Sequence, residues 1–293
     1  MHETKTCPVC GNTELVLFDN IPDHSVSKEI FRITKCPGCD LLFTNPRPDD
    51  HELSRYYQSD NYISHGSKTN NLINKMYVIA RFLTLKSKVR IVKKNAMEGP
   101  LLDIGCGTGH FVKVASQSGR TTIGVEPSEN ARKIALKNNS SIYASLEACH
   151  ERNFSAITLW HVLEHVPDLK NTLALISEKL HPDGTIFIAL PNYASHDGQH
   201  YKQYWAGYDV PRHLWHFNRK AVLELIHSSA LKLKKIIPMK LDSYYVSLLS
   251  ERYKQQGRLS LFGYARGILN GLCSNLSARK TRDYSSIIYV IGK

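Results

Sequence analysis

Gly105, Gly107 and Gly109 follow a short apolar run that ends in Asp103. Glycines at this spacing let backbone amides approach a ligand closely, because a Cβ would block that approach. About twenty residues later Glu126 ends a second apolar run, where a carboxylate can accept both hydroxyls of a ribose. A dinucleotide fingerprint needs its third glycine at position 110, which is His, and the Gly-Lys-Ser/Thr of a phosphate loop is absent.

Four cysteines form two Cys-x-x-Cys pairs, Cys7 with Cys10 and Cys36 with Cys39. Each pair presents two thiolates from one tight turn, and two pairs complete a closed tetrahedral zinc site. Residues 15–18 and 30–34 favour a strand hairpin between the pairs, an arrangement that resembles a zinc ribbon. With four protein ligands the zinc has no open position, so we expect it to be structural and to supply folding energy.

Asp103, the glycine loop and Glu126 together resemble the class I S-adenosylmethionine-dependent methyltransferases in order and spacing. The resemblance implies a Rossmann-like, seven-stranded α/β sheet with helices on both faces. It also implies that S-adenosylmethionine is the cofactor. Leu146 and Glu147 fall where members contact adenine, although members often carry Asp there. The residues expected to bind the cofactor are Asp103, Gly105, Cys106, Gly107, Gly109, Glu126, Leu146, Trp160 and His161.

Four histidines are candidates for catalysis: His161, His165, His213 and His216. The first two lie in His161-x-x-Glu164-His165, directly after an apolar run, where an open α/β sheet places its ligands. A hydroxyl acceptor must lose its proton, and histidine titrates closest to neutral pH, so we expect His165 or His213 to act as the base. If the acceptor is a carbanion or an amine, these side chains only hydrogen-bond it. The segment resembles the Glu-His-Val turn of quinone and sugar methyltransferases. In some quinone O-methyltransferases related acidic and His residues bind a divalent ion, with Glu where this chain has His161, which leaves a metal near Glu164 as an alternative.

Two further segments are candidates for the acceptor site. Tyr56, Tyr57 and Tyr62 precede the first strand of the predicted sheet, where the resemblance implies pocket-lining helices; simple packing is the alternative. A long loop is expected over residues 193–210, followed by Pro-Arg-His-Leu-Trp-His-Phe at 211–217, which resembles a signature of related enzymes. His213, Trp215 and His216 are expected to face the acceptor there, or to cap and pack.

The formal charge of +12 is unevenly spread over the 293 residues. Residues 232–293 hold 12 Lys and Arg against three acidic residues, and residues 68–94 hold eight with no acidic residue. Such segments favour an anionic substrate, RNA or an anionic membrane surface, unless they are solvated helix faces. The sequence has no stretch of 18 apolar residues and no signal-peptide pattern, so we expect a cytoplasmic protein without a membrane span.

The pattern predicts three parts: a zinc-ribbon module at 1–45, a helical cap at 46–95 and a methyltransferase domain at 96–293. An insert at about 243–283 separates the last two strands and carries an apolar periodic stretch interrupted by glycines. It could be a pocket lid, a homodimer contact or a membrane-surface helix; scattered arginines favour the first two. The expected strands are at 101–103, 121–126, 141–144, 154–160, 185–190, 231–238 and 286–291.

Three functions fit these features. The first is methyl transfer to a small molecule, such as a sugar, a lipid-linked saccharide or a phenol, which could be anionic. The second is methylation of an RNA base, guided by the ribbon and the basic segments. Residues 159–162 lack the Asn/Asp-Pro-Pro-aromatic sequence of many base methyltransferases, which disfavours it. The third is a non-catalytic binding module, which the intact glycine loop and Glu126 disfavour.

Overall fold

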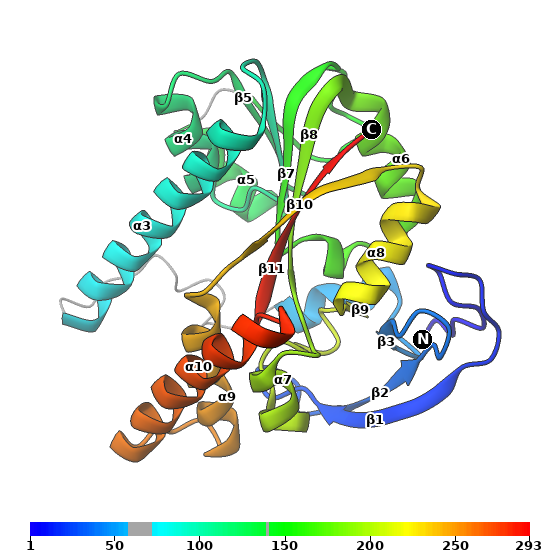
Figure 1. Cartoon of the computed structure of the whole chain (residues 1–293), viewed down its shortest axis with the longest axis vertical. Helices are drawn as coiled ribbons and strands as arrows, with labels where there is room; N and C mark the ends of the chain where they lie inside the picture. Colours follow the sequence, from blue (N-terminus) through cyan, green and yellow to red (C-terminus); the bar gives the residue numbers. More distant parts are fainter. Residues whose placement is uncertain (58–71, 139–140) are drawn as a thin grey trace.

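The computed structural model describes residues 1–57, 72–138 and 141–293, without the side chains of residues 50, 54 and 72–83. A seven-stranded sheet with the order β10-β11-β8-β7-β4-β5-β6 forms its centre (Figure 1). Strands β4 to β8 run parallel, whereas β11 is antiparallel to both of its neighbours. The strands are β4 (Leu101–Ile104), β5 (Thr122–Val125), β6 (Ile142–Tyr143), β7 (Phe154–Trp160), β8 (Leu180–Pro191), β10 (Lys232–Pro238) and β11 (Ser286–Gly292).

Helices cover both faces of this sheet, which confirms the expected Rossmann-like fold. Successive residues of a strand point to opposite faces, so the continuous apolar runs of β4 and β7 supply both layers. On one face α6 (Leu169–Lys179) and α8 (Arg219–Ser228) pack against Leu102 and Ile157. On the other face α3 (Leu72–Asn95) and α4 (His110–Gln117) pack against Leu101 and Ala156. The short α5 (Glu129–Leu136) connects β5 to β6.

A second, four-stranded antiparallel sheet has the order β1-β2-β3-β9. The expected N-terminal hairpin is present as β1 (Val16–Pro22) and β2 (Ile30–Lys35), with β1 running further than the sequence indicated. β3 (Leu42–Thr44) pairs with β2 on one side and with β9 (Trp215–His216) on the other. Because β9 comes from the segment after β8, this second sheet contains strands from both the N-terminal part and the methyltransferase part of the chain.

The chain passes from β3 to the central sheet through α1 (Asp50–Leu53), the short 3₁₀ helix η1 (Ser54–Tyr57) and α3. Tyr62 lies outside the described residues. None of the described helices is long and apolar enough to cross a membrane.

Two expectations about local structure are wrong. The segment 193–210 is not a plain loop, because it contains α7 (His196–Tyr201) and the 3₁₀ helix η4 (Lys202–Tyr204). Its Asp197 is fully buried and accepts hydrogen bonds from the side chains of Trp205, Ser274 and Ser285, so tertiary contacts fix this helix. β8 begins at Leu180 rather than at residue 185, since Leu180 already pairs with Phe154 before a bulge.

The insert folds into a hairpin of two helices, α9 (Asp242–Lys254) and α10 (Leu261–Thr281) (Figure 1). The glycines of α10 do not interrupt the helix; Gly267 and Gly271 face α9, and Gly263 faces the turn before α10. A Cβ on Gly271 would lie 2.8 Å from the Cα atom of Tyr244, and one on Gly267 would lie 2.8 Å from Leu248 Cδ2. Glycine at every fourth position therefore gives α10 one smooth face on which α9 packs closely.

Candidate active site

The glycine loop lies between the end of β4 and the start of α4, with φ angles of 67°, 55° and 78° at Gly105, Gly107 and Gly109. These left-handed conformations favour glycine. At Gly105 a Cβ would lie 2.5 Å from Val162 Cγ2, so the loop also needs glycine to pass the segment after β7. At Gly107 a Cβ would meet no described atom within 4 Å. The backbone of Gly107 is therefore open to a ligand at the N-terminus of α4.

Glu126 stands at the end of β5, next to the glycine loop, and is 9% exposed. Its Oε2 accepts a hydrogen bond of 2.8 Å from the amide of Gly107, and its Oε1 accepts one of 2.8 Å from the amide of Ser128. An ionised carboxylate offers about four acceptor positions, so two remain for a ligand. Glu126 thus joins the loop to the position where a ribose would lie.

Asp103 and Cys106 are buried beneath the loop. Asp103 is 2% exposed, and its carboxylate accepts a hydrogen bond of 2.6 Å from Thr158 Oγ1; burial raises its pKa to about 7. The Cys106 side chain packs against β5, since a Cβ on Gly124 would lie 2.7 Å from Cys106 Sγ. Both residues support the loop from inside the fold, and Cys106 Sγ points into the protein.

Trp160 ends β7, beside β4 in the parallel sheet, and packs edge-to-face on Phe111 with ring centroids 5.4 Å apart. Lys88 of α3 places its Nζ 4.7 Å from the centroid of the Trp160 ring, in the geometry of a cation–π contact. Leu146, the expected adenine neighbour, is buried in the turn that follows β6. Trp160 and the glycine loop therefore flank the point where the strand order reverses, the usual ligand position in such sheets.

His161 follows Trp160 with a φ of 59° and lies between two carboxylates. Its Nε2 is 3.2 Å from Asp242 Oδ2, and its Nδ1 is 3.4 Å from Glu164 Oε1. Burial alone would lower the pKa of His161, but the contacts with Asp242 and Glu164 outweigh it and raise the pKa to about 9. At neutral pH His161 is therefore an imidazolium that bridges Asp242 and Glu164.

Glu164, His165 and His213 form a compact cluster beside His161. Glu164 and His165 belong to the 3₁₀ helix η3 (Leu163–His165), and His213 precedes β9. One donor atom from each side chain lies within 4.8 Å of the others, and the two imidazole centroids are 4.6 Å apart. Glu164 is 1% exposed, and apart from the ion-pair contact of Oε1 with His161 its carboxylate oxygens have no hydrogen-bond partner among the described residues.

Backbone carbonyls orient both imidazoles of this cluster. His165 Nδ1 lies 3.0 Å from the carbonyl oxygen of Arg212, and His213 Nδ1 lies 2.9 Å from that of Gly207. A carbonyl oxygen only accepts, so Nδ1 of each ring carries a proton, and in the neutral form of a ring Nε2 keeps its lone pair. Burial and the neighbouring His213 lower the pKa of His165 to about 4, which keeps that ring neutral. Two imidazole nitrogens and a carboxylate can accept a proton or bind a divalent cation.

The remaining candidates separate into two groups. Tyr57 joins the cluster, because its hydroxyl lies 3.1 Å from His165 Nδ1. Tyr56 is 1% exposed and packs edge-to-face on Phe31. His216 is also buried, with Nε2 3.3 Å from Thr44 Oγ1, so the structure places it in the N-terminal sheet rather than in the cluster. Trp215, which was expected to face the acceptor, donates its Nε1–H to the carbonyl of Val166.

Two residues of the site escaped the sequence analysis. Asp242 lies in the insert, 81 residues from its partner His161, and belongs to no motif. Lys88 stands in a basic segment in which nothing distinguishes it from its neighbours. Only the tertiary fold brings these side chains to the strand ends, so no local signal could have found them.

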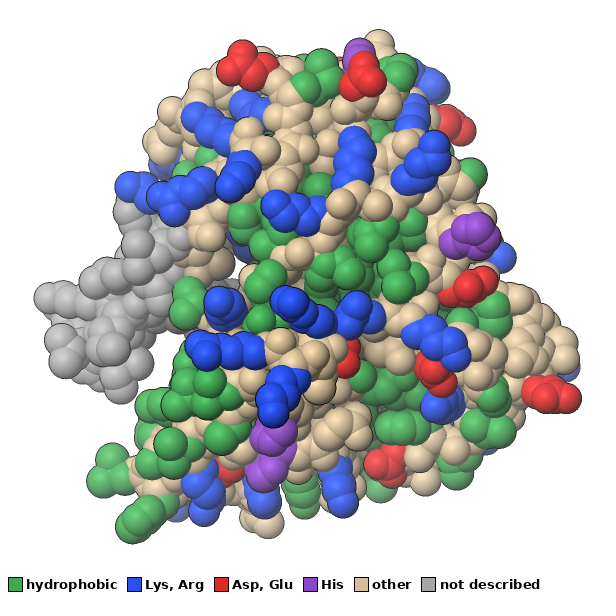
Figure 2. Space-filling model, viewed as in Figure 1, with side chains coloured by type: hydrophobic (Ala, Val, Ile, Leu, Met, Phe, Trp, Pro, Cys, Tyr) green, Lys and Arg blue, Asp and Glu red, His purple; other side chains and the backbone are tan. Residues whose placement is uncertain are grey.

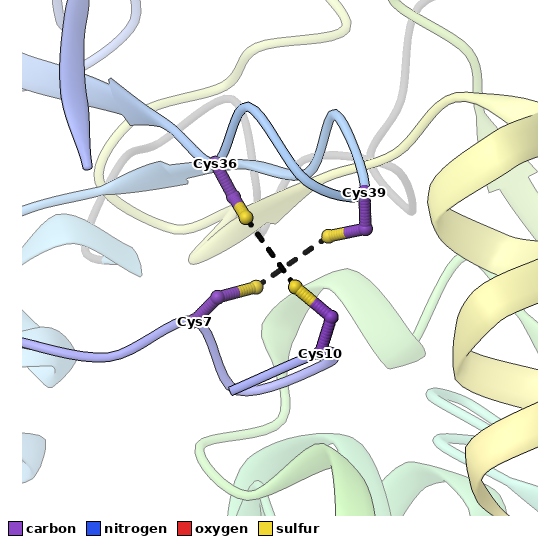
Figure 3. A group of neighbouring side chains, drawn as sticks. All are labelled: Cys7, Cys10, Cys36 and Cys39. Carbon is purple, nitrogen blue, oxygen red and sulfur yellow. Dashed lines mark hydrogen bonds between the residues drawn. The ribbon is translucent and has the colours of Figure 1, made fainter. Parts of the chain in front are cut away.

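The four N-terminal cysteines converge on one point (Figure 3). The sulfurs of Cys7 and Cys39 are 3.5 Å apart, and those of Cys10 and Cys36 are 3.4 Å apart. Zn–S bonds of about 2.3 Å in a tetrahedron put the sulfurs ~3.8 Å apart, so this spacing fits a zinc ion. In each turn an amide donates to the carbonyl of the first cysteine, from Gly11 to Cys7 and from Asp40 to Cys36.

The sheet order and the glycine loop at its switch point define the class I methyltransferase fold. A family model described as a methyltransferase domain matches residues 77–233. This range is more than half of the chain, and the chain belongs to this family.

Relatives and solved structures agree with that assignment. The chain is 36% identical over 115 residues to a ubiquinone biosynthesis O-methyltransferase of Actinobacillus pleuropneumoniae serotype 5b (strain L20), a match that covers 34% of this chain and 49% of the relative. The chain thus spans about half the length of the curated relative.

Two solved structures have the same fold. The cyclopropane synthase MmaA2 from Mycobacterium tuberculosis superposes with a TM-score of 0.52 at 15% identity, over 85% of this chain and 100% of the other. The second is a geranyl diphosphate C-methyltransferase from Streptomyces coelicolor A3(2), in complex with Mg²⁺, geranyl diphosphate and S-adenosyl-L-homocysteine. It superposes with a TM-score of 0.52 at 14% identity, over 85% of this chain and 99% of the other. At these identities the similarity concerns the fold alone.

Proposed function

We propose that this protein transfers a methyl group from S-adenosylmethionine to the hydroxyl of a small molecule. The observation that carries the proposal is the open backbone of Gly107, hydrogen-bonded to Glu126 at the ends of β4 and β5. The histidine–carboxylate cluster at the end of β7 supports it, because a proton acceptor stands near the same strand ends. The family assignment and the name of the relative, an O-methyltransferase, agree with it.

S-Adenosylmethionine supplies an electrophilic methyl group on a sulfonium when it is bound. In the proposed complex Glu126 accepts the two ribose hydroxyls, and the glycine loop at the N-terminus of α4 lies against the carboxylate of the methionine end. Leu146 and Trp160 contribute apolar surface beside the nucleoside. Asp103 and Cys106 hold the loop in shape from below.

The acceptor hydroxyl must lose its proton, and we assign this step to the pair formed by His165 and His213. Both rings direct Nδ1–H to a backbone carbonyl, which leaves Nε2 as the basic nitrogen. His161 is excluded as the base near neutral pH, because its raised pKa keeps it protonated. Sugars, lipid-linked saccharides and phenols all present a suitable hydroxyl, and the relative's name favours a phenol.

We further propose that Cys7, Cys10, Cys36 and Cys39 hold a structural zinc ion. Their spacing fits four thiolate ligands, and such a site stabilises a small module that buries little apolar surface. A divalent cation held by Glu164, His165 and His213 is the alternative to a proton-accepting role for that cluster. The cytoplasmic location stays a prediction.

Methyl transfer from radiolabelled S-adenosylmethionine to a cell extract tests the proposal directly. The extract is separated into small-molecule, lipid and RNA fractions after the reaction. We expect label in a small-molecule or lipid product. Label in RNA alone would favour the base methyltransferase, and no label in any fraction together with no cofactor binding would favour a non-catalytic module.

Variants then test the proton acceptor. We expect His213→Asn or His165→Asn to lower kcat by about 10²- to 10⁴-fold, the usual contribution of a positioned base. His227→Asn on α8 is the matched control, because His227 is exposed and stands on an element away from the cluster. A chelator is then added to the wild type and to full-length His213→Asn. If the chelator lowers the activity of the wild type but not the remaining activity of His213→Asn, the cluster is instead assigned to a divalent cation.

A further inference from the structure

The α9–α10 hairpin presents an apolar face that no described residue covers. Half of the exposed large hydrophobic side chains of the described chain lie between residues 241 and 276. At the tip of the hairpin Leu261 is 86% exposed and Phe262 is 81% exposed. Four more exposed residues continue along α10 at helical spacing: Ile268, Leu269, Leu272 and Leu276. Together these six residues are called the α10 stripe.

The α10 stripe points away from the rest of the molecule. The opposite face of α10 carries three buried glycines: Gly267 and Gly271 pack on α9, and Gly263 packs on the turn that joins the two helices. Figure 2 shows hydrophobic side chains protruding at the lower left, where α10 lies in Figure 1, and Lys and Arg side chains crossing the same face above them. A stripe of leucine and isoleucine on the solvent side of a helix is typical of a docking surface.

The charged residues of segment 259–282, which carries the stripe, are all positive. Residues 259–282 contain no Asp or Glu, and their cations are Arg266, Arg279, Lys280 and Arg282. Both acidic residues of α9 are engaged elsewhere, since Glu251 is 1% exposed and pairs with Arg266 at 3.0 Å, and Asp242 contacts His161. The surface that carries the stripe therefore favours an anionic partner.

We propose that the α9–α10 hairpin docks this protein onto the surface of an anionic lipid bilayer. The stripe would lie at the boundary between headgroups and acyl chains, and the cations would contact the lipid phosphates, as in interfacial amphipathic helices. A second copy of the chain fits less well. A two-fold contact through the same stripe would bring Arg279 and Lys280 of both copies together, and residues 259–282 hold no carboxylate to pair with them. This inference does not depend on the proposed methyl transfer.

Vesicle flotation of the full-length protein tests the proposal. The probes are vesicles of phosphatidylcholine alone and vesicles that also contain about one quarter phosphatidylglycerol. We expect the protein to float with the anionic vesicles, to stay behind with the neutral ones, and to be released at about 0.5 M salt, where charges are screened. A protein that stays behind with both kinds of vesicle would overturn the proposal.

Two sets of variants separate the apolar from the electrostatic contribution. We expect Leu261→Ser combined with Phe262→Ser to weaken vesicle binding by about tenfold or more. Arg279→Gln and Lys280→Gln should each weaken it by about fivefold. The matched control combines Leu136→Ser on α5 with Leu223→Ser on α8, two exposed leucines outside the hairpin.

All of these positions are exposed, so the substitutions should leave the fold intact. Thermal unfolding verifies that each variant folds. Unchanged binding of the Leu261 and Phe262 variant, or equal loss in the control, would contradict docking through the α10 stripe. Analytical ultracentrifugation tests whether a second copy of this chain binds to the α10 stripe instead. A dimer that Leu269→Arg dissociates, combined with no vesicle binding, would assign the stripe to a second copy of this chain.

Discussion

His161 differs in protonation from His165 and His216 because its surroundings differ from theirs. Two carboxylates raise the pKa of His161 to about 9 despite its burial. Burial and the nearby His213 lower the pKa of His165 to about 4, and burial holds the pKa of His216 well below its ordinary value. His161 therefore serves as a fixed positive charge between Asp242 and Glu164, whereas His165 keeps a neutral ring for a substrate.

The raised pKa of His161 is directly measurable. We expect an NMR titration of the ligand-free protein to give a midpoint near 9 for His161, and Asp242→Asn to lower it. Because the folded pKa lies above the unfolded value of 6.5, the stabilisation by this contact is complete below about pH 6.5 and disappears as the pH rises through 9. A midpoint at 6.5 or below would contradict the bridging role; Asp183→Asn, an exposed change on β8, is the control.

The sequence predicts individual site residues where their motif is local. The cysteine pairs, the glycine loop and Glu126 each depend on spacing within a few tens of residues, and the structure brings each set together. Asp242 and Arg212 could not be found in this way. Their partners, His161 and Asp23, are 81 and 189 residues away, so only the tertiary fold creates those contacts.

Among the elements, β3 of the N-terminal sheet contacts the segment that carries the candidate base His213. Thr44 Oγ1 donates to the carbonyl of His213 at 2.9 Å, and the amide of Thr44 donates to the carbonyl of Leu214 at 3.0 Å. The amide of Leu214 in turn donates to the carbonyl of Glu164 at 2.8 Å. The cysteine module thus connects, through β3, to two members of the candidate cluster.

Removal of the proposed zinc should therefore affect the proposed methyl transfer more than cofactor binding. We expect Cys39→Ser, or treatment with a strong chelator, to lower kcat by about tenfold or more, in the range reported for loss of supporting contacts. The affinity for S-adenosylmethionine should change by no more than about twofold, because Glu126 and the glycine loop lie on β4 and β5 rather than on β3. Metal analysis of the purified protein establishes how much zinc is present.

Cys273→Ser is the matched control for this experiment, because Cys273 is an exposed cysteine on α10. An equal loss of cofactor affinity and of kcat in Cys39→Ser would show that the module stabilises the whole fold and does not position His213.

The strands of the central sheet were predictable because long apolar runs with glycine or proline at their ends are a strong local signal. β7 coincides with the predicted range of 154–160. α7 was missed because its sequence is polar and aromatic, and because it is fixed by the buried Asp197, whose partners come from 8 to 88 residues away. The glycines of α10 pointed to an interruption, but they serve helix packing instead.

For the molecule as a whole, Arg212 joins the N-terminal sheet to the methyltransferase part. Its guanidinium is 2.9 Å from Asp23 of the N-terminal part and 2.7 Å from Asp209, and it also donates to the carbonyl of Tyr56. Arg212 is 3% exposed and Asp23 is fully buried. Removal of one partner from such a buried pair costs about 3–5 kcal/mol, so this contact matters for the stability of the whole chain.

The same contact predicts how stability depends on acid. Burial would raise the pKa of Asp23, but Arg212 outweighs it and holds the pKa well below the ordinary value of 3.8. The stabilisation is therefore complete above about pH 4 and is lost as the pH falls through the lower folded pKa. Urea unfolding of the wild type should show a steep loss of stability below pH 4, and Asp23→Asn should be less stable at neutral pH but less sensitive to acid. Equal acid sensitivity of the two proteins would exclude Asp23 as the cause.

Calorimetric titration of the protein with S-adenosylmethionine tests the proposed cofactor site. Glu126→Ala removes the carboxylate proposed to hold the ribose, and Glu129→Ala, three residues later on α5, is the matched control because its carboxylate is exposed and pairs with Lys133. We predict binding by the wild type, unchanged binding by Glu129→Ala, and an affinity about 10- to 100-fold lower for Glu126→Ala, from the loss of charged hydrogen bonds. No binding by the wild type, or equal affinities in all three proteins, would contradict the proposed cofactor site.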